Sequence, residues 1–122
     1  MTTPAQTVRI FGGYLIALAA VLMAAPNLLL EIFGIAPVTD VWIRVTGMLA
    51  GFLGVYYIRA AAAGLTAFFA WTVSVRLSVL LFFGAFVLLN LAPPVLLVFA
   101  VIDAAGAIWT WMALKHTQPI PG

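Results

Sequence analysis

The sequence contains no cysteine and only one histidine, His116, close to the C-terminus. The lack of cysteine excludes disulfides, thiolate metal sites and cysteine nucleophiles. A single histidine cannot ligate a haem on both faces, and no cluster of histidines and carboxylates is present for zinc or iron. We therefore predict no metal and no cofactor.

Charged residues are also scarce. Five basic and three acidic residues make up 7% of the 122 residues, whereas soluble domains average about 25%. The pI near 9.5 reflects this scarcity, because the formal net charge is only +2. No cluster of Lys and Arg exists, so nucleic acid is not an expected partner. So few charges cannot cover the surface of a soluble fold of this length.

Catalytic patterns are missing as well. The sequence offers no set of nucleophile, base and orienting residue, no glycine-rich phosphate loop after a strand, and no pair of carboxylates. This favours a non-enzymatic role and leaves the question of an enzyme open.

Long hydrophobic runs dominate what is present. Apolar residues make up 66% of the chain, and the mean hydropathy is +1.26. A membrane-spanning helix needs about 20 apolar residues. Four segments of one 1–122 domain meet this requirement, at about residues 8–25, 41–62, 65–89 and 94–114. The first run is longer than a typical signal-peptide core and is followed by Pro26, a poor cleavage junction, so we expect a retained helix.

The connections predict the order of the bundle. Residues 26–40 form the longest connection, and its apolar stretch 27–33 predicts a short interfacial helix with Glu31 turned to water. The other two connections are tight and force neighbouring helices to run antiparallel. The predicted fold is therefore an all-α integral membrane protein, an up-down-up-down bundle of four transmembrane helices.

The charges at the helix ends predict the orientation. Glu31, Asp40 and Arg44 fall on one side, and Arg9, Arg59 and Lys115 fall on the side of both termini. The positive-inside rule then places both termini in the cytoplasm. We expect a multi-pass protein of the cell membrane, the inner membrane in a bacterium, with the lipid bilayer as its partner.

Arg76 and Asp103 are the charged residues deepest in the predicted membrane segments. At 1.5 Å per residue, Arg76 lies about 16 Å from the start of its helix and Asp103 about 13 Å from the start of the next. In a hydrocarbon core about 30 Å thick these depths nearly coincide. A central charge costs about 2.5–3.5 kcal/mol on insertion scales, and pairing offsets much of that. Two interpretations stay open, a structural ion pair and the floor of a polar ligand pocket.

Three further polar residues accompany this pair as candidates for ligand binding. Thr72 shares a helix face with Arg76, and Thr110 shares one with Asp103, so both can extend the pair into a network. Arg44 lies one turn inside its helix, four residues after the expected N-cap residue Asp40. It can pair with Asp40, extend toward water or point into a cavity.

Small residues predict close helix packing. The segment of residues 41–62 carries Gly47, Gly51 and Gly54 on one face, the first two in a GxxxG pattern. The first helix offers a matching stripe of small residues, namely Gly13, Ala17, Ala20 and Ala24. Packing between these two helices is favoured, and dimerisation through the same glycines is the alternative.

One pattern extends over most of the chain. It consists of Trp42-Ile43-Arg44 with Gly47, then Tyr56-Tyr57, Arg76, and Asp103 with Gly106-Ala107 and Trp109-Thr110. In this layout the chain resembles small bacterial four-helix membrane proteins, including the DoxX-like group. The resemblance implies the four-helix architecture and, for some members, accessory roles in redox reactions. Because this chain lacks the cysteines and histidines of direct redox chemistry, no catalytic residue is carried over.

Three functions follow as hypotheses. The leading one is a non-enzymatic accessory or interaction subunit with a protein partner or a second copy of itself. The second is a binder, carrier or membrane-embedded enzyme for a lipophilic small molecule, with Arg76 and Asp103 in its pocket. The third is a small dimeric transporter that uses Asp103 as a proton-coupled acid.

Overall fold

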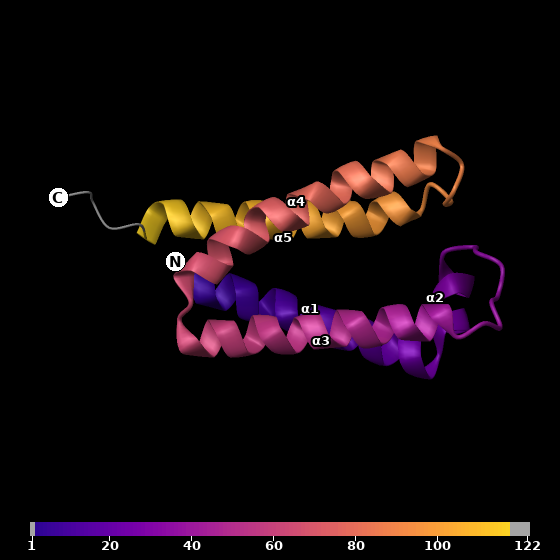
Figure 1. Cartoon of the computed structure of the whole chain (residues 1–122), viewed down its shortest axis with the longest axis horizontal. Helices are drawn as coiled ribbons and strands as arrows, with labels where there is room; N and C mark the ends of the chain where they lie inside the picture. The colour runs from indigo at the N-terminus through magenta and orange to yellow at the C-terminus, as the bar shows by residue number, and fades with distance from the viewer. Residues whose placement is uncertain (1, 118–122) are drawn as a thin grey trace. The chain divides into compact units, whose positions relative to one another are not determined.

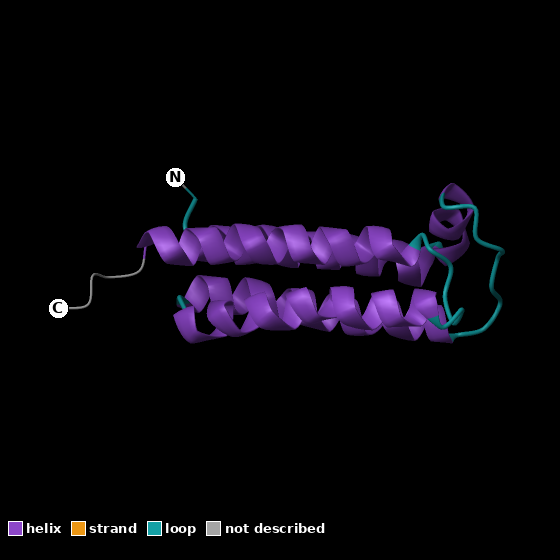
Figure 2. Ribbon diagram, turned by 90° about the horizontal axis from the view of Figure 1, so that it is seen from above, coloured by secondary structure: helices purple, strands orange, loops and turns teal. Residues whose placement is uncertain are grey.

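The computed structural model describes residues 2–117, and every regular element within them is an α-helix (Figures 1 and 2). The helices are α1 (Pro4–Ala24), α2 (Pro26–Ile32), α3 (Trp42–Ala63), α4 (Thr66–Leu88) and α5 (Leu96–Thr117). Four of them, all except α2, are long and apolar enough to cross a membrane. The predicted all-helical class is therefore confirmed, and so is the presence of four helices that are long and apolar enough to span a membrane.

Helix α1 begins four residues earlier than predicted, at Pro4 instead of Val8. The backbone N–H of Gln6 donates to Thr3 Oγ1 at 3.2 Å, and the N–H of Thr3 donates to Gln6 Oε1 at 3.0 Å. This reciprocal exchange is a capping box, with proline at the first helical position where its missing N–H costs nothing. The cap adds a full turn that hydropathy alone does not reveal.

Helices α2, α3 and α4 end in the same way. After α3, the N–H of Leu65 donates to the carbonyl of Ala60 and that of Gly64 to the carbonyl of Ala61. These two bonds form a Schellman motif, which requires a left-handed residue just past the helix. Gly34, Gly64 and Asn90 occupy that position after the three helices, with φ values of 71°, 67° and 58°. The turn chemistry of these residues therefore sets where the helices stop.

The connection after α2 is tied back to that helix. The side-chain amide of Asn27 donates to the carbonyl of Val38 at 3.0 Å, and its oxygen accepts from the N–H of Val38 at 2.9 Å. The stretch predicted to form a short helix is helical, although its place at a membrane interface stays a prediction. At the other end of the chain, α5 begins at Leu96 and not at Pro94, which lies in the preceding turn.

The chain divides into two compact units. One contains the N-terminal residues through Val8 together with Ala60 onward, and α4 packs on α5 within it. The other comprises Arg9–Arg59, where α1 packs against α3. Each unit is therefore built around a pair of long helices. One domain spanning 1–122 stays a prediction.

Glycines allow α1 and α3 to approach closely. A Cβ at Gly54 would lie 2.8 Å from the carbonyl oxygen of Gly12, and a Cβ at Gly47 would lie 2.7 Å from Leu22 Cβ. At Gly51 the nearest atom would be Ala19 Cβ, at 3.1 Å. The three glycines predicted for helix packing therefore face α1, as GxxxG patterns favour.

The partner stripe predicted on α1 is wrong. A Cβ at Gly13 would meet nothing within 4 Å, and Gly13, Ala17, Ala20 and Ala24 are all exposed. The face that meets α3 instead contains Gly12, Ile16 and Ala19. Gly12 and Gly13 are neighbours about 100° apart around the helix, so a shift by one residue selects another face.

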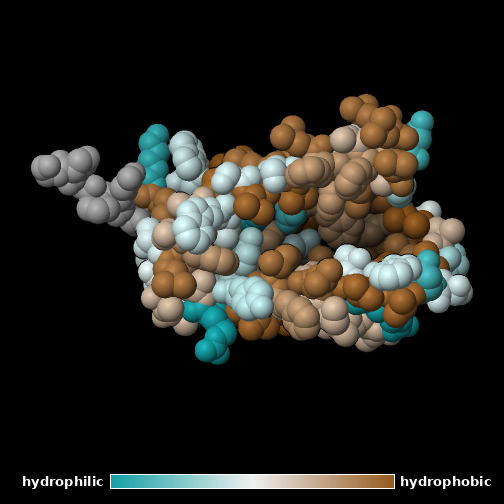
Figure 3. Space-filling view, viewed as in Figure 1, coloured by the Kyte–Doolittle hydropathy of each residue, from teal (hydrophilic) through white to brown (hydrophobic). Residues whose placement is uncertain are grey.

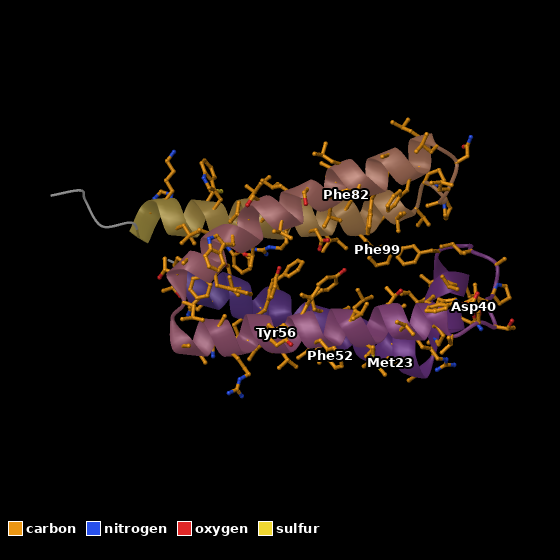
Figure 4. The ribbon with its side chains drawn as sticks, viewed as in Figure 1. Met23, Asp40, Phe52, Tyr56, Phe82 and Phe99 are labelled. Atoms are coloured by element: carbon orange, nitrogen blue, oxygen red, sulfur yellow. The ribbon has the colours of Figure 1, made fainter. Side chains whose placement is uncertain are left out.

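Large apolar side chains remain exposed in both units, and hydrophobic residues cover much of their visible surface (Figure 3). On α3, Phe52 and Tyr56 are 52% and 62% exposed, and on α4 Phe82 is 61% exposed (Figure 4). Leu81 and Leu88, also on α4, are 76% and 85% exposed. Soluble proteins rarely show apolar surface of this extent, whereas lipid accommodates it.

Candidate functional site

Arg76 is the most deeply buried charged residue of the described chain, with 2% of its surface exposed. It lies near the middle of α4, between helix-forming apolar residues. A buried guanidinium needs hydrogen-bond acceptors for its donors, because an unsatisfied buried charge is strongly destabilising. The acceptors around Arg76 therefore define the site.

Two threonines surround the guanidinium. Arg76 Nη2 donates to Thr72 Oγ1 at 3.0 Å and to Thr110 Oγ1 at 2.8 Å. Arg76 Nε also donates to the backbone carbonyl of Thr72 at 3.3 Å. Thr72 is one turn before Arg76 on α4, in the direction in which helical side chains point, and Thr110 reaches across from α5. The structure thus brings together three of the five residues predicted as a ligand site.

A fourth residue, Thr7 of α1, completes the network and was not predicted. Its side chain is fully buried, and its Oγ1 lies 2.8 Å from Thr110 Oγ1. Thr7 also donates its hydroxyl proton to the carbonyl of Pro4 at 2.7 Å. Because that proton is used, Thr110 must be the donor between the two threonines. The bonds therefore run in one direction, from Arg76 to Thr110, to Thr7 and to Pro4.

The same accounting limits the chemistry of the network. Thr72 donates its hydroxyl proton to the carbonyl of Phe69 at 2.7 Å, so both threonines bonded to Arg76 accept from the cation and donate elsewhere. In the part of the chain that the structure describes, these hydroxyls bond to backbone carbonyls, to each other and to the guanidinium, and not to a base that would activate a nucleophile. The arrangement stabilises a buried cation through hydroxyl and carbonyl dipoles and joins the start of α1 to α4 and α5 within one compact unit.

Asp103 is half-buried on α5, on the face that also carries Thr110. It lies seven residues before Thr110, about 10 Å along the axis. Side chains point toward the N-terminus of their own helix, so those of Arg76 and Asp103 point apart on antiparallel helices. Similar depths of the two residues along their helices therefore do not by themselves bring the two charged groups together. Asp103 still lies within the electrostatic range of Arg76, and a direct contact between them stays a prediction.

Arg44 belongs to the other compact unit. Its Nη1 donates to the carbonyl of Met23, in the last turn of α1. A cation at this end of a helix satisfies a free carbonyl and interacts favourably with the helix dipole. Asp40 accepts from the backbone N–H of Trp42 at 3.2 Å, and because α3 begins at Trp42, Asp40 lies one position before the N-cap position that the sequence predicted for it. Arg44 therefore has a capping contact.

A cavity of about 740 Å³ lies beside the network in the same unit. Its lining comes from the start of α1, the start of α4 and the end of α5. Apolar lining residues include Phe69, Trp111 and Leu114, and polar ones are Thr3, Thr66 and Lys115. The volume falls within the range of about 300–1,000 Å³ typical of ligand pockets. The cavity could not be predicted from the sequence, because the residues that line it come from three segments that are distant along the chain.

The network is bonded directly to two walls of the cavity. Pro4 and Phe69 line it, and their carbonyls accept from Thr7 and Thr72. On the third wall, Trp111 follows Thr110 directly in α5. The buried arginine and its threonines therefore hold the three segments that surround the cavity.

Within residues 2–117, no group of three or more His, Asp or Glu residues is placed to hold a metal ion. The buried threonine and arginine side chains lack the carboxylate and imidazole groups that most metal sites use. Comparison of the chain with protein-family models, with curated proteins and with solved structures found no match.

Proposed function

We propose that this chain is a multi-pass membrane protein that acts as a non-enzymatic accessory or interaction subunit, with both termini in the cytoplasm. The four helices cross the bilayer in an up-down-up-down order. The apolar surface of the helices contacts lipid and, in part, a protein partner or a second copy of the chain.

One observation carries the non-enzymatic role. The buried polar side chains of the described residues are hydrogen-bonded to one another and to backbone carbonyls. They are Arg76, Thr72, Thr110 and Thr7. Catalytic groups need a reactive atom that faces a substrate. Here the hydroxyl protons are committed to structural bonds, which supports a clamp that holds helices together.

The orientation rests on the charged residues at the helix ends. Arg9, Arg59 and Lys115 are exposed, as the positive-inside rule requires of cations that remain at a membrane surface. In the proposed topology these three cations lie on the side of the termini. Glu31, Asp40 and Arg44 lie on the other side, so the excess of positive charge is on the side of the termini.

The test of the accessory role is purification from native membranes in a mild detergent, followed by cross-linking and mass spectrometry. We expect one protein at fixed stoichiometry, or a defined homo-oligomer, to remain after extensive washing. A chain that purifies only as a monomer, with no stoichiometric protein, would contradict the proposal.

The cavity of about 740 Å³ favours a second candidate, the binding of a lipophilic molecule. Arg76 is engaged with its threonines, and none of the ligand residues predicted from the sequence lines the cavity. The candidate binding site for a lipophilic molecule is therefore the cavity, and not the region between Arg76 and Asp103.

A further inference from the structure

We propose that the cavity between the start of α1, the start of α4 and the end of α5 binds the headgroup of an anionic phospholipid. This inference rests on the membrane placement proposed above and adds a ligand class to it. The acyl chains would follow the exposed apolar surface of α4 and α5, where Trp71 and Ile108 are 66% and 49% exposed.

The lining is complementary to an anion. Lys115 supplies an ammonium group, and Thr3 and Thr66 supply hydroxyls. Among the described residues, none that lines the cavity carries a carboxylate. Lys115 Nζ lies 5.1 Å from the centroid of the Trp111 ring, a cation–π distance that holds the ammonium beside the cavity wall. A ligand here meets positive charge and hydrogen-bond donors.

The rest of the lining is apolar. Phe69, Ala70 and Leu114 offer no hydrogen bond through their side chains, so a small hydrated anion would lose water without compensation there. An amphiphile, with an anionic head and an apolar body, satisfies both parts of the lining. A phospholipid is such an amphiphile, and it is present at high concentration at the ends of membrane helices.

The network keeps the cavity formed without the ligand. Pro4 and Phe69 are held by bonds from Thr7 and Thr72, which connect to Arg76. A preformed site loses less conformational entropy on binding than a mobile one. The buried polar cluster thus acts as the scaffold of the lipid site, and Arg76 does not itself contact the headgroup.

The experiment is native mass spectrometry of the delipidated protein in a neutral detergent. The protein is titrated with phosphatidylglycerol and, separately, with phosphatidylcholine of the same acyl chains. We expect one phosphatidylglycerol to bind in preference to phosphatidylcholine. Lys115→Gln should weaken phosphatidylglycerol binding about fivefold, because it removes a direct ion pair with the headgroup, and such pairs at exposed sites contribute up to about 1 kcal/mol.

Two other variants complete the design. Arg59→Gln removes an exposed cation that does not line the cavity, and it should leave binding unchanged. Ala70→Phe keeps the charge but fills part of the cavity, so it should also weaken binding. Circular dichroism of each variant checks that it is folded, and Ala70→Phe keeps the test decisive where Lys115→Gln does not fold.

Three outcomes would overturn the lipid site. They are equal binding of the two lipids, equal weakening by Lys115→Gln and Arg59→Gln, and competition by inorganic phosphate at millimolar concentration, which would identify a small-anion site. Alkaline carbonate extraction separates this failure from that of the proposed function. A chain that resists extraction but shows no lipid preference disproves the site alone, whereas a chain that is released disproves the membrane placement as well.

Discussion

Thr110 is the residue on which the buried network depends, because it accepts from Arg76 and donates to Thr7. Replacement by the isosteric valine removes both bonds and leaves a guanidinium donor buried without its acceptor. Couplings between polar groups in membranes average about 0.6 kcal/mol and reach about 1.7. We therefore expect Thr110→Val to lower the free energy of unfolding in detergent by about 1–3 kcal/mol.

The matched control for that change is Thr46→Val. Thr46 is exposed, and its hydroxyl donates to the carbonyl of Trp42 within the same helix at 3.0 Å. Its loss should change the free energy of unfolding by less than about 0.5 kcal/mol. Equal effects of the two substitutions would mean that the buried network contributes nothing beyond local helix bonding.

A pair of double-mutant cycles decides which residue is the partner of Arg76. Arg76→Met combined with Thr110→Val should show a coupling free energy of about 0.6 kcal/mol or more, because the two side chains are hydrogen-bonded at 2.8 Å. Arg76→Met combined with Asp103→Asn should show a smaller coupling, since the two side chains point apart. A larger coupling with Asp103 would restore the ion pair predicted from the sequence.

Three of the four residues of the network could be predicted from the sequence, because helical periodicity determines which residues share a face. Arg76 and Thr72 share a face by helical periodicity, and Thr110 follows from the short α4–α5 connection. Thr7 could not be predicted, because its contact joins residues 103 positions apart. The cap formed by Thr3 and Gln6 was the available signal, since it places Thr7 inside α1.

At the scale of the helices, substitution of alanine for Gly54 of α3 and for Gly13 of α1 should change stability in opposite directions. A Cβ at Gly54 would lie 2.8 Å from the backbone carbonyl of Gly12, which cannot rotate away, so Gly54→Ala should destabilise the helix pair. A Cβ at Gly13 would meet nothing within 4 Å. Gly13→Ala should therefore stabilise α1 by up to about 1 kcal/mol through helix propensity alone.

Thermal unfolding in detergent measures both variants. We expect the melting temperature to fall for Gly54→Ala and to rise or stay constant for Gly13→Ala. The reverse order would show that α1 meets α3 through the stripe that begins at Gly13, as first predicted from the sequence.

The number of long helices and their approximate bounds could be predicted because each of the four helices that could span a membrane is a long apolar run. The face of each helix could not. In a soluble protein, the face of a helix that packs is recognised as the apolar one. In α1 nearly all residues are apolar and small residues occur on more than one side, so this criterion does not identify the packed face. Only the shape of α3, with Gly47, Gly51 and Gly54, selects the side that packs.

For the whole molecule, the orientation in the membrane is the prediction to test. Arg9, Arg59 and Lys115 should lie in the cytoplasm, and the connection of residues 33–41 should lie on the opposite side. Reporter fusions at Gly122 and within that connection distinguish the two sides. A periplasmic signal from the fusion at Gly122 would reverse the proposed topology.

The hydrogen bond between Thr7 and Thr110 has a consequence for the order of assembly during synthesis. Thr110 lies 103 positions after Thr7. Because a ribosome adds about 5–20 residues per second, Thr110 is synthesised roughly 5–20 s after Thr7. Arg76 also precedes Thr110, by 34 positions. Until then its own helix provides the Thr72 hydroxyl and carbonyl as acceptors. The cation thus has acceptors on its own helix before Thr110 is synthesised, and α5, the last helix to emerge, then connects α1 to Arg76.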